Sequence, residues 1–134
     1  MRPAYMLDTN ICIYLMKHQP PQVAERFQQC RVGDVVISAV TAAELEYGVV
    51  TSGATAARNR EALRQFLLEV PVAPFDGSAA VAYGPVRWAT RARCRDALDK
   101  LIAAHAIALE TTLVTTNPAD FQAYPGLRIE NWVA

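Results

Sequence analysis

The sequence lacks the charge excess and the cysteine pattern that define several common classes of protein. Its 13 basic and 13 acidic side chains give a formal net charge of zero. This balance argues against a protein that binds nucleic acid through its overall charge alone, although a local basic patch is compatible with it. The three cysteines, Cys12, Cys30 and Cys94, are odd in number and have no C-x-x-C spacing. They indicate neither a disulfide framework nor a thiolate zinc site.

Long apolar runs are also missing. No uninterrupted apolar stretch reaches the length of about 20 residues that spans a bilayer, and Asp8 follows the start too closely for a signal-peptide core. We therefore expect a cytoplasmic protein with no membrane partner. The 134 residues, of which 52% are hydrophobic, suit one domain over residues 1–134 with a sizeable core.

Short β-type runs alternate with helical patterns along the chain. The β-type runs cover residues 5–7, 34–38, 70–73, 112–116 and 127–130. Pro71 suits an edge strand. Helical patterns cover residues 20–29, 41–50, 54–69 and 78–93, and a last one begins at Asp96 or Asp99 and ends near Leu109. This alternation predicts an α/β fold with a parallel sheet that is covered by helices on both faces.

Acidic and amide side chains stand at the junctions that follow the predicted strands. Asp8 ends the first apolar run, Glu44 lies just inside the helix after the second strand, and Asp99 starts a late apolar helix. Asn117 and Asp120 follow the fourth strand. Because ligands of open parallel sheets bind beyond the carboxyl ends of the strands, we expect these residues to meet at one edge of the sheet.

Three carboxylates in apolar surroundings favour a shared cation, because an unpaired buried charge is costly. Hard oxygen ligands of this kind suit Mg²⁺ or Mn²⁺. Such a cation polarises a phosphoryl oxygen and lowers the pKa of a bound water, which is the chemistry of phosphodiester hydrolysis.

Each acid also has an ordinary interpretation. Asp8 alone is a candidate N-cap of a helix, and Glu44 alone is a candidate solvated glutamate. Asp99 is a candidate first-turn acid, favoured by the helix dipole. Glu46, two residues after Glu44, is expected on the surface. The joint occurrence of the three acids carries more information than any one of them.

Five segments, taken in chain order, resemble the PIN-domain ribonucleases and, within them, the VapC toxins of bacterial toxin–antitoxin pairs. They cover residues 7–14, 37–48, 99–106, 113–121 and 126–132. The first begins Leu-Asp-Thr-Asn, and the second carries Ala-Glu-Leu-Glu-Tyr-Gly. The match extends over nearly the whole chain and implies a three-layer α/β/α fold with a central parallel sheet of four to five strands.

The resemblance implies a role for each matching residue. The implied ligands of Mg²⁺ or Mn²⁺ are Asp8, Glu44 and Asp99. Thr9 and Thr115 would hydrogen-bond these ligands and orient them. Asn117 stands where many relatives carry a fourth acid. Asp120 is an alternative source of that charge, and its ordinary interpretation is a helix cap or surface acid.

One segment departs from the family pattern. Close relatives approach the third acid through a glycine-bearing segment similar to Ile-Gly-Pro, whereas residues 92–98 here read Ala-Arg-Cys-Arg-Asp-Ala-Leu. Asp96 and Asp99 therefore compete for the third position, and a spacing of three places both on one side of a helix. We favour Asp99 because residues 102–105 follow it in the family register. His105 itself is predicted to be a packed, hydrogen-bonded side chain.

Basic and aromatic residues precede this segment. Arg87, Arg91 and Arg95 recur every four residues, so a helix that continued to residue 93 and beyond would align them as contacts for RNA phosphates. The ordinary alternative is a solvated helix face. Trp88 and Tyr83 are candidate stacking platforms for RNA bases, although we expect both rings to pack in the core.

The resemblance implies a divalent-metal-dependent endoribonuclease toxin that cleaves structured RNA, with tRNA favoured. It also implies a homodimer and a VapB-type antitoxin, which would lie across a groove formed by surplus apolar side chains of residues 11–16. A PIN-like module that binds RNA or a protein partner without cleavage stays open as an alternative, because the altered approach to Asp99 and the neutral Asn117 weaken the site. An aspartate-nucleophile phosphatase is disfavoured, since Asn10 stands where that chemistry needs a second acid.

Overall fold

Five parallel strands form one sheet in the spatial order β3-β2-β1-β4-β5. The computed structural model describes residues 2–133. The strands are β1 (Tyr5–Leu7), β2 (Val35–Ser38), β3 (Val72–Ala73), β4 (Thr112–Val114) and β5 (Arg128–Glu130). All five predicted strands are confirmed, and β3, directly after Pro71, lies at a sheet edge as predicted.

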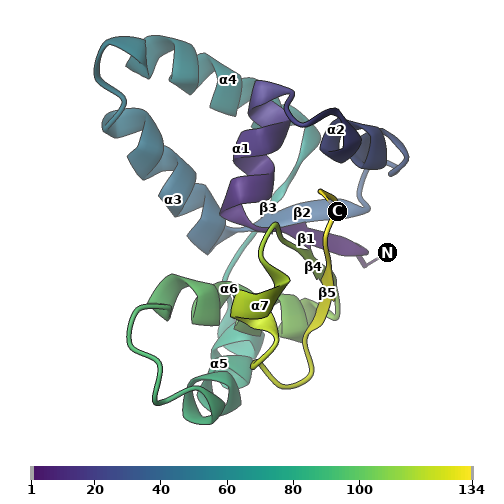
Figure 1. Cartoon of the computed structure of the whole chain (residues 1–134), viewed down its shortest axis with the longest axis vertical. Coiled ribbons are helices and arrows are strands. Elements are labelled where there is room, and N and C mark those ends of the chain that lie inside the picture. The colour runs from purple at the N-terminus through teal and green to yellow at the C-terminus, as the bar shows by residue number, and fades with distance from the viewer. Residues whose placement is uncertain (1, 134) are drawn as a thin grey trace.

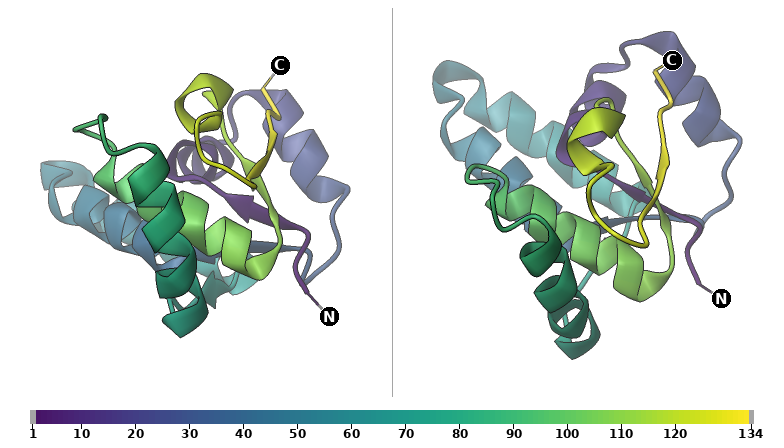
Figure 2. Two further views of the ribbon diagram at one scale, coloured as in Figure 1. Left: turned by 90° about the horizontal axis from the view of Figure 1, so that it is seen from below. Right: turned by 60° about the horizontal axis from the view of Figure 1, so that its bottom comes forward.

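Helices cover both faces of the sheet (Figure 1). One side carries α1 (Thr9–Lys17), α2 (Pro21–Gln28), α3 (Ala39–Val50) and α4 (Ala56–Glu69), with a short 3₁₀ turn (Gly53–Thr55) between the last two. The other side carries α5 (Gly77–Ala89), α6 (Ala97–Leu109) and the short α7 (Pro118–Phe121). Figure 2 shows α5 and α6 lying together below the sheet, away from α1 and α2. The predicted three-layer α/β/α fold is confirmed.

Alternating side chains of the strands divide the core into two layers. Leu7 and Val114 pack with the side chains of α1, α3 and α4. Met6 and Leu113, their neighbours in the chain, pack with α5, α6, Phe121 at the end of α7 and Tyr124 after it. Successive side chains of a strand point to opposite faces, so each short strand serves both layers. This double burial explains why the central strand β1, Tyr-Met-Leu, has no alternation of polar and apolar residues.

The helix predicted over residues 78–93 ends earlier than expected. Asp76 starts α5 by accepting the Ala79 N–H at 3.2 Å, and the helix stops at Ala89. Thr90 then donates its hydroxyl to the carbonyl of Val86 at 2.8 Å, and residues 90–96 form an irregular connection. The helix α7 was not predicted, because four residues are too few for a periodic signal.

Two consequences follow for the residues near the end of α5. Arg91 and Arg95 lie beyond the helix, so the prediction that they share a helical stripe with Arg87 is wrong. Trp88 is 68% exposed, so the prediction that it packs in the core is wrong. Tyr83, by contrast, packs against the core beside α6, as predicted. Across residues 2–133, no helix combines the length and the apolar character needed to cross a bilayer.

Candidate metal centre

The site begins where the strand order reverses. Strand β1 has β2 on one side and β4 on the other, so the sheet grows in opposite directions from β1. In parallel sheets, ligands bind at such a switch point, beyond the carboxyl ends of the strands. Asp8 follows β1 and Thr115 follows β4, and the Asp8 N–H donates to the carbonyl of Val114 at 2.9 Å. At this end of the sheet, the Thr115 hydroxyl also hydrogen-bonds to the Asp8 carboxylate.

Asp8 is buried, with 7% of its surface exposed. Its Oδ1 accepts the Ile11 N–H at 2.9 Å and caps α1, so the ordinary interpretation of this residue is confirmed. Burial raises the pKa of Asp8, hydrogen bonds from Thr115 and Ile11 lower it, and the charge of Glu44 raises it again, for a net increase. The cap uses one carboxylate oxygen. Because burial still disfavours the charged form of Asp8, a nearby cation would stabilise it.

Glu44 comes to the same place from α3. The Thr9 hydroxyl donates to Glu44 Oε1 at 2.7 Å, across 35 residues of chain. The residue next to Asp8 therefore holds the second acid in position, which is the role that was expected for Thr9. Glu46 is exposed and pairs with Arg60 at 2.7 Å, which confirms its surface placement.

Asp99 completes the predicted set from the first turn of α6. The pKa of Asp99 is raised to about 6 by its burial and then by the charges of Asp120, Glu44, Asp8 and Asp96, in that order of size. Those four carboxylates come from four other positions in the chain, and all of them repel the charge on Asp99. The acids predicted from sequence thus share one electrostatic environment.

Asn117 and Asp120 act as a pair beside this environment. The Asn117 side-chain amide donates to Asp120 Oδ2 at 2.8 Å, and both side chains are exposed. The Asn117 backbone N–H donates to the Thr115 hydroxyl at 3.1 Å. Asn117 therefore orients a nearby carboxylate, and Thr115 connects the pair to Asp8.

The donor chemistry fits a hard divalent cation. Within residues 2–133, no three His, Cys, Asp or Glu side chains stand close enough together to enclose an ion directly. Burial, and after it the charges of the other carboxylates, nevertheless raise the pKa of Asp99, and a cation among them would relieve that repulsion. Mg²⁺ retains several waters and needs few protein ligands, so widely spaced carboxylates are compatible with it. The assignment of Asp8, Glu44 and Asp99 as ligands stays a prediction.

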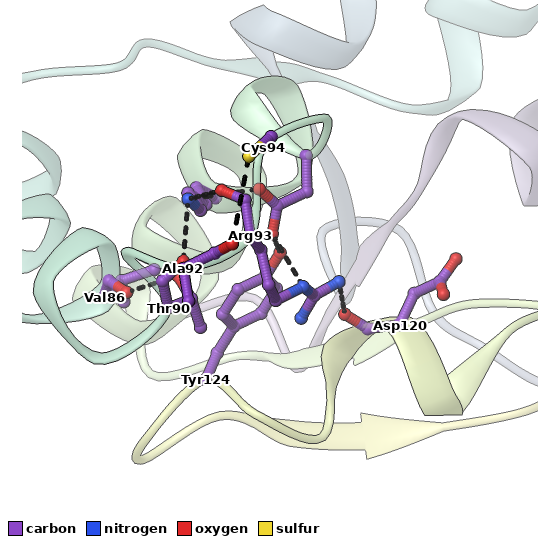
Figure 3. A network of polar contacts seen from close by, with 9 residues as sticks. Val86, Thr90, Ala92, Arg93, Cys94, Asp120 and Tyr124 are labelled. Carbon is purple, nitrogen blue, oxygen red and sulfur yellow. Dashed lines mark hydrogen bonds and ion pairs between the residues drawn. The ribbon is translucent and has the colours of Figure 1, made fainter.

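Asp96 has quite different surroundings, which we call the Asp96 cluster and which consist of Arg93, Asp96, Lys100 and Tyr124. Asp96 Oδ1 lies 3.1 Å from Lys100 Nζ. Its Oδ2 accepts the Tyr124 hydroxyl at 2.7 Å and lies 3.2 Å from Arg93 Nε. Figure 3 shows Arg93 between Tyr124 and Asp120.

The charge of Asp96 is compensated by this cluster. Burial acts to raise the pKa of Asp96, but the Tyr124 hydrogen bond and the charges of Lys100 and Arg93 outweigh it, so the pKa lies below its ordinary value. A carboxylate already satisfied by protein groups has little need of a cation. This geometry favours Asp99 over Asp96 as the third acid.

Sequence reasoning missed the partners of Asp96. Lys100 lies four residues after it, a spacing that brings opposite charges together on a helix, so this partner was detectable. Tyr124 lies 28 residues away and carries no comparable signal. His105 was predicted correctly as a packed residue. It is 1% exposed, its Nδ1 lies 2.7 Å from the Ser38 hydroxyl, and burial lowers its pKa.

Comparisons with known proteins agree with this architecture. The PIN domain model matches residues 5–127. The tRNA(fMet)-specific endonuclease VapC of Shigella flexneri is 38% identical over 130 residues, which are 96% of this chain and 97% of the relative. Ribonuclease VapC2 of Rickettsia felis is 35% identical over 133 residues, with coverage of 96% and 97%.

The chain therefore belongs to the PIN-domain family. Its relatives within that family are VapC ribonucleases. The crystal structure of DNA-bound VapBC from Salmonella typhimurium superposes with a TM-score of 0.88 at 35% identity, over 97% of this chain and 98% of that one. VapBC2 from Rickettsia felis, bound to a DNA fragment from its promoter, gives 0.86 at 34% identity, with coverage of 96% and 98%.

Proposed function

We propose that this protein is a divalent-metal-dependent endoribonuclease toxin of the VapC type. Its substrate is structured RNA, with tRNA as the first candidate, and a VapB-type antitoxin neutralises it. The protein acts as a single PIN domain over residues 1–134 and works in the cytoplasm. One observation carries the proposal: at the switch point of a parallel sheet, the residue after buried Asp8, Thr9, donates to Glu44 Oε1 at 2.7 Å across 35 residues of chain. The charges of both acids also act on Asp99 from the start of α6. The relatives named as VapC endonucleases and ribonucleases support it.

The residues of the site divide into ligands and the groups that hold them. Asp8, Glu44 and Asp99 would hold Mg²⁺ or Mn²⁺. Thr9 keeps Glu44 turned toward Asp8 through its 2.7 Å hydrogen bond, and Thr115 donates to Asp8. When bound, the cation polarises the phosphoryl oxygen and lowers the pKa of a water, so that hydrolysis leaves a 5′-phosphate and a 3′-hydroxyl.

The surface beside the end of α5 suits RNA. Arg87, Arg91 and Arg95 are all exposed, and guanidinium groups match phosphates. The Arg91 guanidinium lies 4.0 Å from the centre of the Trp88 ring. An exposed indole next to a guanidinium offers both a stacking surface for a base and a charge for the backbone. We propose that these groups position RNA, and that they do so without a shared helical stripe.

A groove on the other side of the molecule suits the antitoxin. It has a volume of about 770 Å³ and is lined by α1, α2 and α4, including Leu15, Met16, Phe27 and Phe66. Two of these residues come from the apolar run that was expected to form such a groove. The VapBC complexes to which this chain is similar support an antitoxin partner, and we propose this groove as its binding place because of its apolar lining. Exposed Tyr47 and Val50 on α3 are candidates for the contact with a second copy.

The test is cleavage of purified tRNA by the purified protein, with the new 5′ ends mapped by sequencing. We expect Mg²⁺-dependent cuts that disappear with a chelator and in Asp8→Asn and Asp99→Asn. The matched control is Glu46→Gln, a surface glutamate that should cut like the wild type. Cleavage that persists in both aspartate variants contradicts the proposal. Co-purification with the product of the neighbouring gene, and loss of cutting in the complex, would identify the antitoxin.

A second candidate is a PIN-like module that binds RNA or a protein without cleaving it. The observation that favours it is the spacing of the acids, since no three of those described enclose an ion directly. The same assay separates the two candidates. A binding module retains RNA in the presence of a chelator and creates no new ends.

A further inference from the structure

The Asp96 cluster spans the part of the chain that departs from the family pattern. Lys100 is 7% exposed, and its ammonium donates to the carbonyls of Thr90 and Arg93, both at 3.1 Å. The ammonium also forms an ion pair with Asp96, whose Oδ1 lies 3.1 Å from Lys100 Nζ. These bonds join the end of α5, the connecting loop and the first turn of α6. The loop is therefore anchored from within, without the glycine-bearing approach of the relatives.

The same cluster reaches the segment that carries Asp120. Arg93 donates to the backbone carbonyl of Asp120 at 3.0 Å, and its guanidinium lies 5.3 Å from the centre of the Tyr124 ring. Tyr124 follows α7 and packs edge-on against Phe121, with ring centroids 5.7 Å apart. Figure 3 shows the Asp120 carboxylate pointing away from Arg93 while its carbonyl points toward it. Arg93 thus holds the backbone of Asp120, while the carboxylate accepts the Asn117 amide at 2.8 Å.

Asp99 is not a member of the cluster, but in the sequence it lies between two members, Asp96 and Lys100, in the first turn of α6. Asp99 and Asp120 carry like charges and repel each other, so their segments need something else to keep them together. The cluster supplies it with two cations, one shared carboxylate and hydrogen bonds to three backbone carbonyls.

We propose that the Asp96 cluster is a positioning device, in which Arg93 and Tyr124 hold the Asp99 and Asp120 segments at the separation that the cation requires. The inference rests on the proposed function, because it assigns these residues a task at the same site. It also gives Asp96 a role. Asp96 neutralises the charges of Arg93 and Lys100, the cations of the cluster that positions Asp99.

The test compares Arg93→Gln and Tyr124→Phe with the wild type. Arg93→Gln removes the tie to the Asp120 carbonyl, and Tyr124→Phe removes one hydroxyl while the ring stays packed. The matched controls are Arg58→Gln and Tyr14→Phe, which make the same chemical changes outside the site. Mn²⁺ affinity is measured by calorimetry with the metal alone, and kcat and KM are measured separately on tRNA.

We expect both cluster variants to bind Mn²⁺ roughly 10-fold more weakly and to lose a similar factor in kcat, as is typical when groups behind a metal ligand are removed. KM for tRNA should stay within about 2-fold of the wild type, because the variants leave the RNA-facing groups in place. If Arg93→Gln does not fold, Tyr124→Phe still tests the inference, since it deletes a single oxygen and leaves the ring in place.

Variants that melt earlier but bind Mn²⁺ and turn over like their controls would overturn the inference, because a purely structural cluster changes only stability. Failure of the proposed function looks different. In that case the wild type shows no Mg²⁺-dependent cleavage, or Asp99→Asn cleaves as the wild type does. The affinity for Mn²⁺ is read without any cleavage, so the two results remain separate.

Discussion

The start of α6 carries two carboxylates whose surroundings are opposite, Asp96 at the N-cap position and Asp99 in the first turn. Asp96 is 7% exposed and is paired with Lys100 and Arg93, and its pKa lies below the ordinary value. Asp99, three residues later, has no such cation among the described residues, and its burial and then the charges of neighbouring carboxylates raise its pKa to about 6. Burial alone therefore does not distinguish a structural acid from a functional one. The distinction is whether the protein itself supplies the opposite charge.

The comparison extends from two residues to two regions. The Asp96 cluster is closed, since cations, a hydroxyl and backbone carbonyls of the chain satisfy one another. The acidic edge formed by Asp8, Glu44 and Asp99 is open in the sense that no protein cation within residues 2–133 compensates its charges. The carboxylates repel one another, and hydroxyl partners such as Thr9 carry no charge. Perturbed carboxylates of the second kind are typical of functional sites. Four predictions test this contrast.

The largest effect is expected in the closed region. Lys100→Met should lower the free energy of unfolding by about 3 kcal/mol, because it removes the buried cation of Asp96 and leaves the more exposed Arg93 as its remaining ion-pair partner. Urea unfolding followed by circular dichroism measures the change. Lys17→Met, at the exposed end of α1, is the control and should cost less than about 1 kcal/mol. A loss of the same small size in both variants would show that the buried pair contributes nothing.

The open region should respond to a cation instead. Mg²⁺ at about 100 times its dissociation constant should stabilise the wild type by about 2.7 kcal/mol, because binding to the folded state shifts the folding equilibrium. Scanning calorimetry at matched ionic strength measures this as a rise in Tm. The rise should be absent in Asp99→Asn and intact in Glu46→Gln. Equal responses in all three proteins would mean that the ion binds elsewhere.

A smaller effect is expected from the hydroxyl that holds Glu44. Thr9→Val keeps the shape of the side chain but removes the 2.7 Å hydrogen bond to Glu44 Oε1. We expect kcat on tRNA to fall roughly 10-fold, about 1.4 kcal/mol of barrier, with little change in stability. Thr55→Val, an exposed threonine before α4, is the control. Unchanged turnover in Thr9→Val would remove this residue from the site.

The smallest effect has the opposite sign to the first. The folded-state pKa of Asp99, about 6, exceeds the ordinary value of 3.8, so its ionisation destabilises the metal-free fold as the pH rises through 6. Asp99→Asn should therefore unfold later than the wild type at pH 8, by about 1 kcal/mol after allowance for solvent screening. The two proteins should converge near pH 4. A variant less stable than the wild type at pH 8 would refute the idea that ionised Asp99 destabilises the fold.

Sequence patterns predicted the larger elements because those elements are specified locally. The five strands appear where apolar β-type runs were found, and α6 begins within the segment proposed for it. The end of α5 was misplaced because the residues after Ala89 have no strong breaker, and the turn depends on the Thr90 bond to Val86 and on Lys100. The exposure of Trp88 was also missed, since an aromatic residue on an apolar helix looks like core.

The candidate site divides in the same way. The positions of Asp8, Glu44 and Asp99 at strand ends and helix starts were readable, because parallel strands bring their carboxyl ends to one edge. The choice between Asp96 and Asp99 was weighed from register alone. Tyr124 settles the surroundings of Asp96 from 28 residues away, and no local pattern carries that information.

By itself the sequence determined the order of strands and helices and the set of acids at their junctions, because hydrophobic period and turn chemistry act over a few neighbouring residues. Only the tertiary structure decided which acid is neutralised and which is left charged. The energy of a buried charge depends on the groups that surround it in space, and those groups arrive from distant parts of the chain.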